Sequence, residues 1–349
     1  MNFSIANKRI GKNENVFIIA ELSANHNQNF EIAVKTIRAI KDSNADAVKL
    51  QTYTPDTITI NCSNEYFQIN QGTIWDGKTL YELYKEAYTP WDWQPKLKKI
   101  AEDLGLICFS SPFDKTAVDF LEKINVPAYK IASFEITDIP LIEYTASKGK
   151  PMIISTGIAE LKDIEEAIRA CKREGNNQIA LLKCTSAYPA PIEDTNLATI
   201  PDMAHRFDCI IGLSDHTLGI TVPAAATILG AKIIEKHFIL DKNLGGPDAL
   251  FSLNPDEFKQ MTKTVREAEK SIGKINYELT ERAKKNKIFS RSLFVIKNIK
   301  EGEFFTEENI KSIRPGHGAA PAELKNIIGK KSLKAISAGT PLSLNDVQI

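Results

Sequence analysis

The 349-residue chain has no net charge, no long apolar run and no pair of closely spaced cysteines. Its five cysteines are odd in number and widely separated, so we expect free thiols in a reducing cytoplasm rather than disulfides or a zinc knuckle. Basic and acidic residues balance at 44 each, which excludes a bulk attraction to nucleic acid or an anionic membrane. No apolar run approaches the ~20 residues of a membrane span, and residues 1–16 lack the apolar core of a signal peptide. The expected partners are therefore small molecules.

Short apolar runs alternate with helical patterns from residue 16 to near residue 270. Near-continuous apolar strands separated by helices are typical of a parallel sheet that is covered on both faces. Eight such units in about 250 residues predict an α/β fold, a (β/α)8 TIM barrel. The alternative is an open doubly wound sheet, but no G-x-G-x-x-G follows the first strand. The predicted strands are residues 16–21, 46–51, 106–111, 128–133, 151–156, 179–184, 209–214 and 231–238.

Two segments depart from this alternation. The connection after the second strand runs from Thr52 to about Pro90, and a long insertion at this face of a barrel is more often an active-site wall than a random loop.

Residues 276–289 are charged and predict a linker between a barrel domain, 1–275, and a small module, 290–349. The module holds an internal repeat around Gly302 and Gly339, which predicts two similar strand–turn–short-helix units. Such a small core is marginal, so we expect the module to lean on another surface.

Lys49 and Lys130 lie inside otherwise apolar predicted strands, where lysine is almost never buried without a partner. Three interpretations remain open. The lysines form structural ion pairs with Glu21 or Glu135, or they bind an anion together with serine hydroxyls and backbone N–H groups. In the third, one lysine is a Schiff-base nucleophile, as in aldolases.

His216 and His237 end adjacent predicted strands and stand 21 residues apart, about one strand–helix unit. With Glu21 and Asp248 at neighbouring strand ends, they offer a mixed nitrogen and oxygen donor set. Such a set suits Mn²⁺ or a similar divalent ion better than thiolate-bound zinc. Cys184 has no base beside it in the sequence, and we expect it to pack in the core.

Ordered motifs over nearly the whole chain resemble the sialic acid synthase family. They are FIIAELSANHN, VKLQT, SSPF, YKIASFE, STG, CTSAYP, GLSDHT, EKHF, GPD and IRPGHG. The resemblance implies a TIM barrel followed by a small C-terminal antifreeze-like (SAF) domain, in agreement with the independent prediction. Where sialic acid synthases tend to read KHQT, KIGSGE and CTN.YP, this chain reads KLQT, KIASFE and CTSAYP, which is similar to the pseudaminic acid synthase branch.

The resemblance also implies roles for individual residues. Glu21, Lys49 and Lys130 are expected to be catalytic, and His216 and His237 to bind a divalent metal, Mn²⁺ with Mg²⁺ or Co²⁺ as alternatives. Phosphoenolpyruvate is expected to contact Lys49, Ser111, Lys130, Ser133, Ser155, Ser186 and Ser214. The sugar is expected to contact Gln51, Tyr188, Asp248 and Arg314, with Arg314 supplied by the partner subunit of a domain-swapped homodimer.

The implied reaction joins phosphoenolpyruvate to an amino sugar and releases phosphate. For the pseudaminic branch the sugar is 2,4-diacetamido-2,4,6-trideoxy-altrose, and Tyr53, Phe134 and Ala187 are expected to give its pocket apolar contact and room. An N-acetylneuraminate or legionaminate synthase is the alternative, and a Schiff-base aldolase is a remote one. The likeness of the module to ice-binding proteins also suggests a non-enzymatic binding role. Such a role would leave the barrel, with two histidines spaced to bind a metal, without a purpose.

Overall fold

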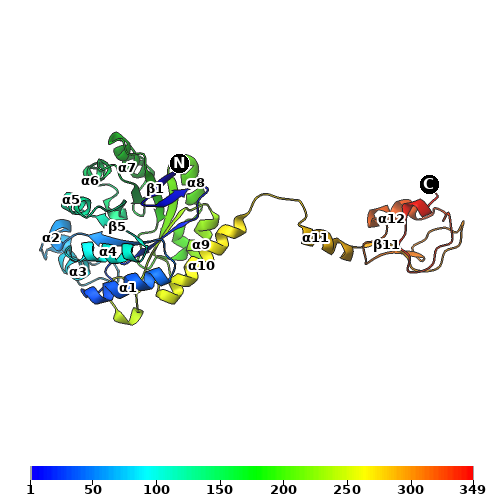
Figure 1. Ribbon diagram of the computed structural model, residues 1–349, viewed down its shortest axis with the longest axis horizontal. Coiled ribbons are helices and arrows are strands. Elements are labelled where there is room, and N and C mark those ends of the chain that lie inside the picture. Colours follow the sequence, from blue (N-terminus) through cyan, green and yellow to red (C-terminus); the bar gives the residue numbers. More distant parts are fainter. Residues whose placement is uncertain (1, 349) are drawn as a thin grey trace. The chain divides into compact units, whose positions relative to one another are not determined.

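The computed structural model describes residues 2–348, and the chain divides into two compact units, one ending at Gly273 and the other starting at Lys274. In the first unit, eight parallel strands form a closed barrel, as the sequence predicts (Figure 1). They are β3 (Phe17–Glu21), β4 (Ala47–Thr52), β5 (Ile107–Pro112), β6 (Tyr129–Ile131), β7 (Met152–Ser155), β8 (Ile179–Cys184), β9 (Ile210–Asp215) and β10 (Ile233–His237).

The barrel closes between its last and first strands, where Ile233 pairs with Phe17 and His237 pairs with Glu21. Because all eight strands are parallel, their carboxyl ends meet at one end of the barrel. The helices that follow the strands lie around the outside. They are α1 (Phe30–Asp42), α4 (Gln94–Asp103), α5 (Lys115–Lys123), α6 (Ile139–Ala146), α7 (Leu161–Arg173), α8 (Thr199–Arg206), α9 (Thr221–Ile228) and α10 (Pro255–Ile272).

Local sequence signals set the bounds of these helices. The Asn29 side chain accepts hydrogen bonds from the backbone N–H groups of Glu31 and Ile32 at the start of α1. Asn254 and Glu257 form a reciprocal capping box at the start of α10. The barrel strands are buried along their length and need no alternating pattern, because they face the barrel interior on one side and the helices on the other.

A short hairpin precedes the barrel and was not predicted from the sequence. It pairs β1 (Asn2–Ile5) with β2 (Lys8–Gly11) in antiparallel register, and Ile5 and Ile10 are fully buried. Its turn shares a cavity with residues that precede β5 and β6, which places the hairpin at the amino end of the barrel, opposite the strand ends where ligands bind.

The insertion after β4 carries short elements of its own: α2 (Pro55–Ile58), the 3-10 helix η1 (Glu65–Phe67) and α3 (Leu80–Ala87). The carboxylate of Asp76 accepts hydrogen bonds of 2.9 Å from the backbone N–H groups of Gly72 and Thr73 and so fixes the turn that presents Trp75. The insertion is thus an ordered wall that follows directly from the carboxyl end of a strand.

The second unit has a small core of its own. It contains α11 (Glu281–Asn286), within the segment predicted as a linker, an antiparallel pair of β11 (Ser292–Val295) and β12 (Ile310–Ile313), and α12 (Leu324–Ile327). Ile299 and Ile336, which occupy equivalent positions of the internal repeat, exchange both backbone hydrogen bonds at 2.9 and 2.8 Å. The repeat therefore reflects a symmetric pairing within one core.

Two expectations about the whole chain can also be compared with the structure. None of the helices within residues 2–348 is both long and apolar enough to cross a membrane. All five cysteines are free thiols, as predicted.

Candidate active site

Buried polar atoms without a hydrogen-bond partner gather at the carboxyl end of the barrel. Within residues 2–348, every residue with such a side-chain atom lies at the end of a barrel strand or in the loop after it. They are Asn25, Ser111, Glu135, Ser155, Ser186, Glu235 and His237, together with Glu21, whose Oε2 is engaged only by its ion pair with Lys49. Each unpaired buried group costs about 1–3 kcal/mol, so their concentration at one place is typical of a site that a ligand completes.

Lys49 and Lys130 meet at a single carboxylate oxygen. Glu235 Oε1 lies 3.0 Å from Lys49 Nζ and 3.2 Å from Lys130 Nζ, and it accepts a hydrogen bond of 3.1 Å from the Ser214 hydroxyl. Lys49 also pairs with Glu21, and all of these groups are buried. The structure thus contains the ion pairs that one interpretation of the sequence expected, but the shared partner is Glu235.

Burial and neighbouring charges shift the pKa values of Lys49 and Glu235. Burial lowers the pKa of Lys49 to about 7, although the Glu235 carboxylate opposes this shift. Burial alone would raise the pKa of Glu235, but the charges of Lys130 and Lys49 outweigh it and hold the pKa low. Glu235 is therefore a carboxylate at neutral pH, and it lies between the two lysine side chains.

Glu135 has a different environment, although the sequence offered it as a partner for the lysines. Burial raises the pKa of its carboxyl to about 7, with the charge of Lys130 opposing the shift. Its Oε2 has no hydrogen-bond partner. A carboxyl that is half protonated near neutral pH is suited to proton transfer.

The predicted phosphoenolpyruvate-binding serines form a cradle around Gly157. Ser133 Oγ accepts a hydrogen bond of 3.1 Å from the Gly157 backbone N–H. A Cβ atom at this glycine would clash with Ser186 Oγ and lie 2.7 Å from Ser133 Oγ, so any larger residue would displace the two hydroxyls from their present positions. With the unpartnered hydroxyls of Ser111 and Ser155, this arrangement offers several donors for the oxygens of an anion.

The rings of His216 and His237 are neighbours, with centroids 5.3 Å apart and planes inclined by 56°. Nδ1 of His216 lies 3.1 Å from the Thr185 carbonyl oxygen, which favours a proton on Nδ1 and leaves Nε2 with a lone pair. Burial above all lowers the pKa of His237 well below its usual range, and its Nδ1 has no hydrogen-bond partner. Two imidazoles with available lone pairs fit a divalent metal ion.

The residues expected at the sugar adjoin this histidine pair. Gln51 donates to Glu21 Oε1 at 3.1 Å and to Ser23 Oγ at 3.0 Å, and Ser23 in turn donates to Asp248. Asp248 Oδ2 lies 3.7 Å from His237 Nδ1. No group of three or more His, Cys, Asp or Glu side chains within residues 2–348 is arranged to hold a metal.

The remaining expected residues differ in their placement. The ring of Tyr188 lies 4.5 Å from that of His216. Tyr53 is 3 % exposed and packed edge-on against other aromatic rings, whereas Phe134 is 58 % exposed and Ala187 is half-buried. Arg314 is exposed and belongs to the second unit, directly after β12, so the barrel brings together every expected site residue but this one.

Four residues at or beside the site were not among those expected to act there. Glu235 and Glu135 both stand at strand ends in the sequence, but neither was assigned a catalytic or binding role, and Glu135 was considered only as an ion-pair partner of the lysines. Cys184, expected in the core, is buried but also lies 3.4 Å from Ser133 Oγ and 3.8 Å from His216 Nδ1. Trp75 gave no local signal, because it comes from the middle of the insertion.

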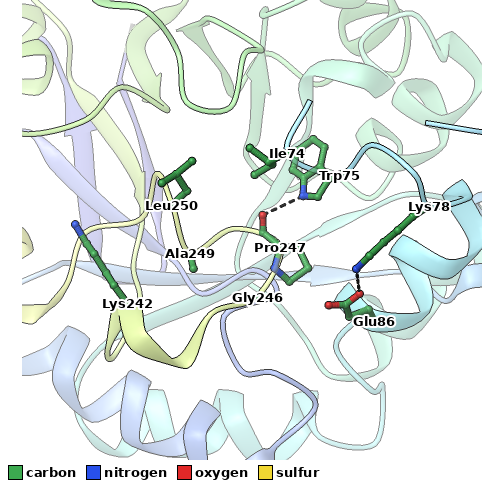
Figure 2. A pocket seen from close by; sticks show the side chains of 9 residues that line it. All are labelled: Ile74, Trp75, Lys78, Glu86, Lys242, Gly246, Pro247, Ala249 and Leu250. Carbon is green, nitrogen blue, oxygen red and sulfur yellow. Dashed lines mark hydrogen bonds and ion pairs between the residues drawn. The ribbon is translucent and has the colours of Figure 1, made fainter. Parts of the chain in front are cut away.

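A cavity of about 490 Å³ lies between the insertion and the loop after β10 (Figure 2). Its lining includes Trp75 together with Pro247 and Ala249, the two neighbours of Asp248, and the indole Nε1–H of Trp75 donates to the Pro247 carbonyl oxygen at 3.0 Å. None of the expected site residues lines this cavity, which therefore adjoins the site from outside.

Comparison with known proteins agrees with this geometry. Residues 36–277 match the NeuB family. The chain belongs to the NeuB family. Residues 290–348 match the SAF domain, so both parts of the predicted resemblance are confirmed.

Individual relatives cover nearly the whole chain. A pseudaminic acid synthase of Helicobacter pylori is 48% identical over 332 residues, which are 95% of this chain and 97% of that protein. An N,N'-diacetyllegionaminic acid synthase of Legionella pneumophila is 38% identical over 95% of this chain and 94% of that one. A solved structure, the N-acetylneuraminic acid synthetase of Leptospira borgpetersenii in complex with citrate, is 31% identical with a TM-score of 0.72, over 82% of this chain and 95% of that one.

Proposed function

We propose that this NeuB-family protein condenses phosphoenolpyruvate with 2,4-diacetamido-2,4,6-trideoxy-altrose to give pseudaminic acid and phosphate. The observation that carries the proposal is the cluster of Lys49, Lys130 and unpartnered serine hydroxyls at the barrel mouth, in a chain 48% identical to a pseudaminic acid synthase. The higher identity to this relative than to the legionaminic acid synthase, at 38%, favours the pseudaminic substrate over the alternative.

The lysines and serines would hold the two acidic groups of phosphoenolpyruvate. Glu21 and Glu235 already pair with Lys49 and Lys130. A bound phosphoenolpyruvate would therefore add net negative charge to this buried place. Donors that are fixed before the substrate arrives stabilise the phosphate as it leaves without further reorganisation. Glu235 would act by keeping both ammonium groups aimed at that place.

His216 and His237 would hold the divalent metal, for which Mn²⁺ is proposed with Mg²⁺ or Co²⁺ as alternatives. When bound, such an ion supplies Lewis acidity to the aldehyde of the open-chain sugar. Neighbouring Gln51, Tyr188 and Asp248 would orient the sugar against it.

Proton movements must accompany the change of bonds. A carbon–carbon bond forms between C3 of phosphoenolpyruvate and the aldehyde carbon, water adds at C2, and the bond from C2 to the phosphate oxygen breaks. The water gives up both of its protons: one reaches the aldehyde oxygen, and the other reaches the departing phosphate as the new C2 hydroxyl becomes the carbonyl. Glu21, which lies on the sugar side, and Glu135, whose pKa is about 7, are the carboxyls available for these transfers.

A swapped homodimer would complete the site by bringing Arg314 from the partner subunit to the sugar. The segment between the barrel and β11 supports a covering partner, because Ile275 and Tyr277 are 92% and 98% exposed. Free cysteines suit the cytoplasm, where we place the reaction.

The test offers purified full-length protein phosphoenolpyruvate and Mn²⁺ with one of three sugars: the trideoxy-altrose, the 2,4-diacetamido mannose-type precursor of legionaminic acid, or N-acetylmannosamine. Phosphate release gives kcat/KM, and mass spectrometry with NMR identifies the product. We expect the trideoxy-altrose to have the highest kcat/KM and to yield pseudaminic acid. A higher value for either other sugar contradicts the substrate assignment, and a covalent adduct after borohydride treatment would indicate a Schiff-base aldolase instead.

A further inference from the structure

Trp75 brings the middle of the insertion after β4 next to Tyr188 of the active site. The turn that carries it is held by Asp76, and its indole Nε1–H is engaged by the Pro247 carbonyl oxygen at 3.0 Å. Since the only polar atom of the side chain is occupied, what Trp75 presents to its surroundings is carbon surface. Figure 2 shows the indole lying against the loop that holds Pro247.

A series of aromatic rings connects this indole to the histidine pair. The Trp75 and Tyr188 centroids are 5.4 Å apart, and those of Tyr188 and His216 are 4.5 Å apart. In series these two steps place the indole at most about 10 Å from the His216 ring. An open chain of six carbons spans about 6 Å, given ordinary bond lengths. A sugar whose aldehyde lies at the histidines is therefore long enough for its far end, C4 to C6, to approach Trp75 when it extends along this series of rings.

We propose that Trp75 is a specificity-determining residue whose indole face forms the apolar wall for the 6-deoxy end of the sugar. This inference rests on the proposed function and deepens it. A methyl group at C6 packs against the ring, whereas a hydroxyl there loses water and finds no partner on the indole. An apolar wall of this kind discriminates by about 10–100-fold, because it cannot hydrogen-bond the extra hydroxyl.

The cavity beyond the indole explains why its size matters. Trp75 lines the 490 Å³ cavity and also contacts Tyr188. With alanine at position 75, the surroundings of Tyr188 would open into this cavity, and water could reach the far end of the sugar. A hydroxyl at C6 could then be solvated, while a methyl group would still fit. The preference for the 6-deoxy sugar would be lost.

The test compares four proteins: the wild type, Trp75→Ala, Trp75→Phe and Tyr66→Ala. Tyr66 is a matched control, because it lies on the same insertion and is 80% exposed. Each protein is assayed with the trideoxy-altrose and with its 6-hydroxy counterpart, and KM for phosphoenolpyruvate is measured alongside. Thermal unfolding and Mn²⁺ binding establish that each variant is folded and keeps its histidine pair.

We expect Trp75→Ala to reduce the wild-type preference for the 6-deoxy sugar by about 10-fold or more, mainly through the sugar KM. KM for phosphoenolpyruvate should stay within about two-fold, and Trp75→Phe and Tyr66→Ala should keep the preference. An unchanged preference in Trp75→Ala overturns the inference. So does an equal loss in Trp75→Phe, which would show that the indole acts only through its hydrogen bond to Pro247.

The wild-type arm tests the proposed function separately. If the wild type uses a different amino sugar, the substrate assignment fails. The proposed contact between Trp75 and the far end of the sugar is then tested by the effect of Trp75→Ala on the KM of that sugar. A Trp75→Ala variant that leaves this KM unchanged, or that raises the KM of phosphoenolpyruvate by the same factor, overturns the wall as well.

Discussion

Lys236 on β10 and Asp215 on β9 are direct register partners, and their side chains form a fully buried ion pair immediately behind the two histidines of the site. Lys236 also donates to the Thr217 carbonyl oxygen at 2.6 Å, and Asp215 accepts from the Thr217 backbone and hydroxyl. Because side chains alternate along a strand, His216 and His237 follow on the opposite face. The ion pair therefore ties together the two strand ends that carry the histidines.

Removing the ammonium should destabilise the barrel strongly. In Lys236→Met the Asp215 carboxylate stays buried without its cation, and we expect the free energy of unfolding to fall by about 3–5 kcal/mol. Urea unfolding monitored by circular dichroism measures this change. Lys263→Met is the control, because Lys263 forms an exposed pair with Glu267 on α10 and should change the stability by less than about 0.5 kcal/mol. Equal stability of the two variants would contradict a structural role for the buried pair.

Metal binding should depend on the two neighbouring imidazoles of His216 and His237. His216→Ala and His237→Ala should each bind Mn²⁺ at least about 10-fold more weakly, because each removes one of two protein donors. Isothermal titration calorimetry measures the affinity, and chelator treatment should abolish activity until Mn²⁺ or Co²⁺ is added. His205→Ala, at an exposed position of α8, should bind as the wild type does. Full activity in metal-free protein would refute the assignment.

The raised pKa of Glu135 predicts a pH-dependent contribution to stability. The unfolded carboxyl ionises above about 4.5, whereas the folded one ionises only above about 7. Between these values ionisation favours the unfolded state, so stability falls as pH rises from about 4.5 to 7, by on the order of 3 kcal/mol. Glu135→Gln should lack this contribution, which urea unfolding of both proteins across the range would reveal. Parallel stability curves for the two proteins would mean that Glu135 has an ordinary pKa.

The swapped dimer predicts complementation between two inactive variants. Arg314→Ala and Lys130→Ala should each be nearly inactive alone, because each lacks one residue in both sites. After mixing and reassociation, one site of a heterodimer has both residues intact, and activity should approach about one quarter of wild type if subunits mix at random. Lys130→Ala taken alone through the same procedure is the control. Heterodimers without activity would show that Arg314 does not act across the interface.

The barrel itself was readable from local sequence. Runs such as Phe17–Glu21 and Ile179–Cys184 are apolar except for one charged residue near the end, and such near-continuous burial is typical of a strand covered on both faces. Closure of such strands brings their carboxyl ends together, so the convergence of Lys49, Lys130, His216 and His237 followed once the barrel was predicted. The amino-terminal hairpin was missed because four-residue strands carry too little pattern to distinguish them from a loop.

By itself the sequence determined the strands, the order of the polar residues at their ends and the family to which they belong. Only the tertiary structure decided which of these residues are partners. Glu235 joins Lys49 across 186 positions of the chain, and Trp75 reaches Pro247 across 172. Nothing in the residues around Trp75 distinguishes it from any other aromatic side chain in a loop. Its place beside Tyr188 is set by the closure of the barrel and by the turn around Asp76, because contacts at such separations depend on how the whole chain packs.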